Sequence, residues 1–180
     1  MSAGIGNILD QGAEFDAGMY VVSQALTFDY LWSEVRVKGG AYGTGFTINP
    51  NGNCGAYSYR DPDINATLSV FDQIPEYIRT FGETQDLTQL IIGTIAATDP
   101  LLSPAARIRL ADARYFRHTT YEDRLQTRQQ IQNLTVEDFR SYADLFEKVK
   151  NDIAICVIGD RDTVNSLEGF TEIKTDETEE

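Results

Sequence analysis

The chain has 180 residues, of which 42% are hydrophobic and 11% aromatic, and its formal net charge is −13. This composition suits one globular domain with a full core, and no run approaches the roughly 18 apolar residues that span a bilayer. The net charge argues against a nucleic-acid partner, because phosphate binding needs a basic face, and we expect neither a nucleic-acid partner nor a membrane.

The first predicted helix follows a glycine-rich opening. Residues 1–16 show no period, and we expect an irregular connection there. A helix is predicted over about residues 16–37, because its apolar side chains recur at the spacing of one helical face. These side chains are Phe28, Leu31, Trp32 and Val35. Gly39 and Gly40 then end the helix, since glycine takes left-handed backbone angles without penalty.

A β-hairpin follows the two glycines. From residue 41 the period changes to two, which predicts a strand over 41–48. One face of this strand carries Tyr42, Thr44, Phe46 and Ile48. Turn residues at 49–53 predict a hairpin with a return strand at about 54–59.

The remainder of the chain is predicted to be mostly helical. Asp61 is expected to cap a helix that reaches about residue 81, with a bend or break at Pro75. Further helices are predicted at about 84–97, 104–116, 121–133 and 136–148. The apolar run 153–158 then reads as a strand buried on both faces. A short helix after Gly159 and a possible strand at 170–173 complete the chain.

This order of elements predicts an α+β fold, a two-layer α/β sandwich in which helices cover one face of an antiparallel sheet. We expect a single domain over 17–174 and a solvated acidic tail at 175–180. Cys54 and Cys156 lack CxxC spacing, so both are predicted to be core or half-buried thiols, which is compatible with a reducing compartment.

The candidate site is the corner between the first helix and the first strand. Arg36 and Tyr42 leave the two sides of this corner, and a guanidinium and a phenol can together hold a carbonyl oxygen that acquires negative charge. Structural roles are the alternatives, a cation at a helix C-terminus and a half-buried strand aromatic. Gly39 and Gly40 would allow the backbone of an extended substrate to approach closely.

Three strings carry a family resemblance: LWSEVRVKGGAYGTGF, SYRDPDINATLSVFDQIPEYI and LIIGTIAATDPLLSPAAR. The chain resembles the C-terminal half of the pitrilysin-type zinc metallopeptidases, the inverzincins, in their presequence-protease-like branch. In that family the second half supplies an arginine and a tyrosine, at the separation of Arg36 and Tyr42, that hold the substrate across the zinc. The resemblance implies peptide substrates, the N-terminal half of the same protein as partner, and a cytoplasmic or organelle-matrix location.

The zinc motif of that family, HxxEH, is missing from these 180 residues. His118 is the single histidine, and catalytic zinc takes about three protein ligands. We therefore expect zinc in the parent enzyme, no metal bound by this chain, and His118 at the surface. The resemblance implies a substrate-binding C-terminal fragment of a zinc endopeptidase that degrades unstructured peptides. The alternative is a non-catalytic peptidase-like scaffold or interaction domain.

Overall fold

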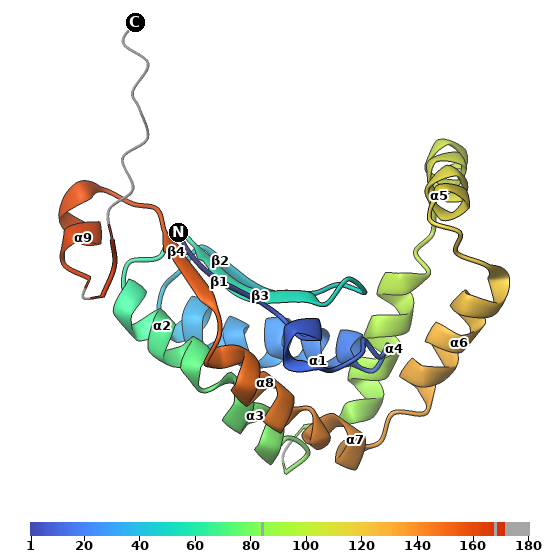
Figure 1. Ribbon diagram of the computed structural model, residues 1–180, viewed down its shortest axis with the longest axis horizontal. Helices are drawn as coiled ribbons and strands as arrows, with labels where there is room; N and C mark the ends of the chain where they lie inside the picture. Colours follow the sequence, from blue (N-terminus) through green and yellow to red (C-terminus); the bar gives the residue numbers. More distant parts are fainter. Residues whose placement is uncertain (84, 168, 172–180) are drawn as a thin grey trace, which may run out of the picture.

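The computed structural model describes residues 1–83, 85–167 and 169–171. Within them, four strands form one antiparallel sheet in the order β2-β3-β1-β4. The strands are β1 (Ser2–Asn7), β2 (Gly43–Ile48), β3 (Asn53–Tyr59) and β4 (Ala154–Val157). Helices lie against one face of this sheet and leave the other face open (Figure 1). The predicted two-layer α+β architecture is confirmed.

Strand β1 lies inside the sheet, between β3 and β4, so the irregular connection predicted for residues 1–16 is wrong for this segment. A short 3-10 helix, η1 (Leu9–Gln11), follows it. The sequence of this strand shows no alternation of apolar and polar residues, because two of its positions are glycines. Gly6 lies under the next layer, where an added Cβ would come 2.7 Å from Val149 Cγ1. Close packing between layers therefore explains the composition of this strand.

The first helix has two parts, α1 (Met19–Ala25) and a π-helical segment, η2 (Leu26–Lys38). The buried residues of η2 are Leu26, Leu31 and Val35. A π-turn contains more residues than an α-turn, which explains the wider spacing of these three. Phe28 and Trp32 are consequently 60% and 40% exposed, and the prediction that they share the buried face is wrong.

Proline divides the next predicted helix in two, as expected. Helix α2 (Ile64–Asp72) is followed by α3 (Ile74–Thr80), and Pro75 occupies the first turn of α3. The N-cap of α2 is Asp63, whose carboxylate accepts from the Ala66 N–H at 3.0 Å, and not Asp61 as predicted. Asp61 instead accepts a hydrogen bond from Ser58 Oγ at 2.6 Å, which ties the end of β3 to this loop.

Helices α4 to α9 complete the described part of the chain. Their bounds are α4 (Leu87–Thr98), α5 (Pro104–Phe116), α6 (Tyr121–Gln132), α7 (Val136–Ser141), α8 (Ala143–Lys150) and α9 (Arg161–Asn165). Helices α6 and α7 confirm two of the predicted helices, and each begins with a capping box between a threonine and the aspartate three residues later. In the core, Phe81 stacks on Phe139 with ring centroids 3.9 Å apart. Helices α4, α5 and α6 extend sideways from this core as an arm (Figure 1).

Strand β4 is an edge strand, and the prediction that it is buried on both faces is wrong. Among the described strands it pairs only with β1, and no described helix covers the open face beside it. Cys156 is exposed as a result, whereas Cys54 on β3 is buried as expected. The acidic tail at 175–180 and most of the possible strand at 170–173 lie outside the described residues.

The two cysteines should differ sharply in reactivity. Burial raises the pKa of the Cys54 thiol to about 11, and the thiolate is the reactive form. We expect an aromatic disulfide reagent at about pH 8 to modify Cys156 while Cys54 stays unmodified, as followed by intact-mass spectrometry. Denaturant should release both thiols. Equal rates in the folded chain would contradict this packing.

Candidate functional site

The corner between η2 and β2 is closed by backbone hydrogen bonds and two glycines. The Gly39 N–H donates to the carbonyl oxygen of Glu34 at 3.0 Å, and the Ala41 N–H to that of Val35 at 3.1 Å. A Cβ on Gly39 would lie 2.6 Å from the Val35 oxygen, and Gly40 has a φ of 79°. Both glycines are therefore required by the turn itself.

Arg36 leaves the last turn of η2 and stacks on an aromatic ring. Its Cζ lies 3.8 Å from the centroid of the Trp32 ring, a cation–π contact that orients the guanidinium. The nearby Lys38 pairs with Glu34 at 2.7 Å. Among the described residues no carboxylate pairs with Arg36, so its N–H donors remain available to a ligand.

Tyr42 lies on the strand side of the corner and is 65% exposed. Its backbone N–H donates to the carbonyl oxygens of Tyr59 and Arg60 at 3.1 and 3.2 Å. The Tyr42 ring meets the Tyr59 ring edge-on, with centroids 5.9 Å apart. Within the described part of the chain, neither a hydrogen bond nor a ring contact joins Tyr42 to Arg36. The two side chains lie at one corner but are held by different neighbours.

Arg60 is a third member of this corner, and the sequence did not indicate it. Its Cζ lies 5.5 Å from the ring centroids of both Tyr42 and Tyr59. Its φ of 48° is left-handed, a region that non-glycine residues seldom adopt. The hairpin register pairs Gly43 with Tyr59, which brings Arg60 beside Tyr42. A register drawn from the turn would have supplied this signal.

The outer edge of β2 is closed near its middle by two hydroxyl side chains. Ser23 Oγ and Thr27 Oγ1 donate to the Phe46 carbonyl oxygen at 2.8 and 3.1 Å. The Phe46 N–H in turn donates to Thr27 Oγ1 at 3.0 Å. An extended chain can therefore not pair with β2 at Phe46.

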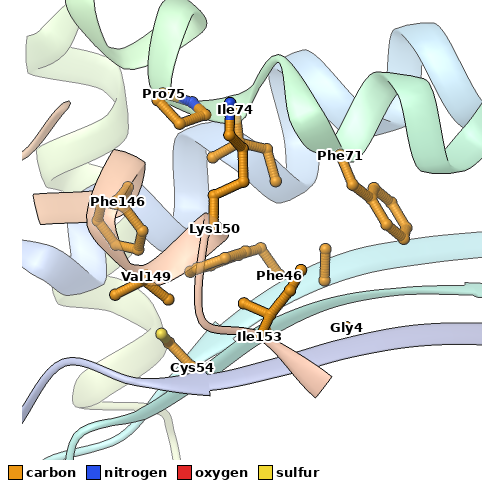
Figure 2. Close-up of a pocket in the computed structure, with 12 residues that line it drawn as sticks. Gly4, Phe46, Cys54, Phe71, Ile74, Pro75, Phe146, Val149, Lys150 and Ile153 are labelled. Carbon is orange, nitrogen blue, oxygen red and sulfur yellow. The ribbon is translucent and has the colours of Figure 1, made fainter. Parts of the chain in front are cut away.

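A small cavity of about 50 Å³ lies away from this corner, between the sheet and helices α2, α3 and α8. Figure 2 shows Phe46, Cys54, Phe146 and Val149 converging on it. The Lys150 amine at its rim donates to the Asp72 carbonyl oxygen at 3.4 Å and does not enter it as a free charge. The cavity is a packing space of the core.

The described residues do not fit a zinc site. No group of three histidine, cysteine or acidic side chains among them is arranged to hold a metal ion. His118 is exposed in the turn between α5 and α6, with a φ of 55°. In the same described part of the chain, no helix is both long and apolar enough to cross a membrane.

Comparisons with known proteins show the family of this chain and a solved structure with a related fold. The family model described as the PreP C-terminal domain matches residues 2–161. The chain therefore belongs to the PreP C-terminal domain family. Its structure is also similar to that of a putative zinc protease from Bordetella pertussis, with a TM-score of 0.59 and 11% identity over 88% of this chain and 93% of the other.

Two curated relatives illustrate the family. The chain is 35% identical to a protein named HypA from Clostridium perfringens, over 94% of this chain and 18% of the relative. It is 33% identical to presequence protease 1, chloroplastic/mitochondrial, from Arabidopsis thaliana, over 94% of this chain and 16% of the relative. The chain thus spans less than a fifth of either relative.

The left-handed backbone of Arg60 can be tested by a matched pair of substitutions. Arg60→Gly and Arg60→Ala both remove the guanidinium, but only alanine keeps a Cβ at positive φ. We expect the alanine variant to unfold with a free energy about 1 kcal/mol lower than the glycine variant. Urea denaturation followed by circular dichroism measures the difference. Equal stabilities would show that residue 60 does not hold this conformation in solution.

Proposed function

We propose that this chain is the C-terminal, substrate-binding part of a zinc-dependent endopeptidase that degrades unstructured peptides. The observation that supports this proposal is a pair of available donors at one corner. Arg36 is stacked on Trp32 without a carboxylate partner in the described residues, and the Tyr42 ring is mostly exposed. The relatives that are named presequence proteases support a peptide as substrate.

In the proposed role, Arg36 and Tyr42 hold the carbonyl group of the bond to be cleaved. When water adds to this carbonyl, its oxygen gains negative charge. A phenol supplies one directional donor, and a guanidinium supplies a permanent charge with several more donors. Donors already aimed at that oxygen stabilise the transition state more than the ground state, which is what accelerates the reaction.

The neighbours of these two residues would keep them in position. Stacking on Trp32 restricts the plane of the Arg36 guanidinium, and Tyr59 with Arg60 restricts the Tyr42 ring. Gly39 and Gly40 would leave the corner backbone open to an extended peptide. Because Ser23 and Thr27 close the edge of β2 at Phe46, such a peptide would lie on the Tyr42 side of that position.

Zinc would be held by the part of the enzyme that this chain does not contain, since the described residues do not fit a metal site. We infer that the N-terminal half of the same protein is the partner that completes the site. Some relatives are named mitochondrial or chloroplastic, which supports an organelle matrix as the compartment in organisms that have these organelles. In other organisms we infer the cytoplasm.

The 180-residue chain by itself should bind no stoichiometric zinc and cleave no peptide. The physical reason is the lack of three convergent ligands among its described residues. Metal analysis of the purified chain after incubation with zinc, together with a fluorogenic peptide assay, measures both properties. Bound zinc with chelator-sensitive cleavage would overturn the proposed division of labour.

In the intact enzyme, Tyr42→Phe should lower kcat by about 10²–10³-fold, as loss of one oxyanion donor does, with little change in stability. Arg36→Lys should also be impaired, because lysine keeps the charge but loses the planar donor array. Zinc content should stay normal in both variants. Tyr20→Phe, the same change on α1 away from the corner, serves as the control. Parental kcat and KM for Tyr42→Phe would reduce Tyr42 to a packing role and favour the scaffold alternative.

A further inference from the structure

The arm formed by α4, α5 and α6 carries a charge opposite to that of the protein. Residues 104–132, which span α5 and α6, contain six arginines against three acidic residues, a net charge of +3 in a chain of net charge −13. The arginines are Arg107, Arg109, Arg114, Arg117, Arg124 and Arg128. A local positive field on an acidic protein attracts acidic partners and repels basic ones.

Helix α5 also has little support from the rest of the described structure. None of its 13 residues is buried, and it lies at the tip of the arm, far from the sheet (Figure 1). Ile108 and Tyr115, seven residues apart on one helical face, are 64% and 77% exposed, and Phe116 beside them is 77% exposed. Isolated helices of about this length are marginal in water. A covering surface would supply the missing burial.

A cleft of about 420 Å³ lies beneath this helix, between α4, α5 and α6. Arg114, Arg124 and Arg128 line it, together with the apolar side chains of Ile95 and Leu125. Arg128 is 3.8 Å from Asp99, and both groups are largely exposed, so this ion pair does not neutralise the cleft. The cleft therefore offers guanidinium donors around an apolar floor, which suits carboxylates next to apolar side chains.

We propose that α5, α6 and the cleft below them form a docking surface for an acidic, apolar-faced segment of the peptidase outside this chain. Charge complementarity gives the chemistry of the partner. We assign the partner segment to the same protein because the chain spans only 18% and 16% of two relatives, whose remaining sequence must pack somewhere. The assignment of the partner to the same peptidase rests on the proposed function. The docking surface itself is inferred from the charge and exposure of the arm.

Limited digestion with trypsin tests the proposal directly, because the arm is rich in its target residue. In the 180-residue chain, α5 should open locally and be cut after Arg107 and Arg109. In the full-length protein, the same bonds should be cut at least about tenfold more slowly. The bond after Arg79, in α3 on the core, is an internal control that should resist equally in both. Equal cleavage of the arm in both proteins overturns the proposal.

Two further measurements separate the apolar and the electrostatic contributions to the proposed contact. In the full-length protein, Tyr115→Asp should restore fast cleavage after Arg107 and Arg109. Ile158→Asp, at another exposed position far from the arm, should not. Raising salt from about 0.05 to about 0.5 M should also speed cleavage of the arm, because screening weakens an acidic contact. Protection that is insensitive to salt overturns the acidic partner.

The remaining outcomes also decide between occupants. If the arm is protected in the 180-residue chain and sedimentation shows a dimer, the occupant is a second copy and the proposal is wrong. Peptide cleavage is measured on the same full-length samples. A protected arm in a zinc-loaded protein that cleaves nothing supports the docking surface while refuting the proposed enzymatic function, so the two failures are distinguishable.

Discussion

Two hydroxyl groups, those of Ser23 and Thr27, attach the helical layer to the edge of the sheet. Together they occupy both backbone hydrogen-bonding groups of Phe46, while Leu31 and Val35 of the same helical segment are buried in the core. With the helix and the strand fixed to each other, the chain between Lys38 and β2 has little freedom. The Gly39–Gly40 turn is the consequence, and the positions of Arg36 and Tyr42 follow from it.

The corner collects groups that would be unusual together on an ordinary surface. Two arginines and two tyrosines contact one another or a tryptophan, and Arg60 holds a left-handed backbone angle beside them. Non-glycine residues in that region cost energy and occur often at functional sites. The stacking contacts restrict long side chains that would otherwise lose entropy on binding a ligand. Such preorganisation suits a surface that must present donors in fixed directions.

The rest of the molecule is unevenly covered. One face of the sheet is packed under helices, whereas the other face carries exposed Ile5, Tyr57 and Tyr59. Strand β4, at one edge of the sheet, has no buried residue. Helix α5, at the tip of the arm, has none either. Contiguous exposed apolar surface is uncommon on a free-standing domain. These surfaces fit a chain that spans less than a fifth of its relatives.

The sequence by itself determined most of the helices and the glycine turn of the corner. Periodicity and turn residues located the β2–β3 hairpin, the break at Pro75 and helices α6 and α7, because these signals depend on residues close together in the chain. Tertiary structure decided the rest. It placed β1 inside the sheet, turned Trp32 outward onto Arg36, exposed β4 and brought Arg60 to Tyr42. Each of these depends on which distant segment lies alongside, and local periodicity carries no information about that neighbour.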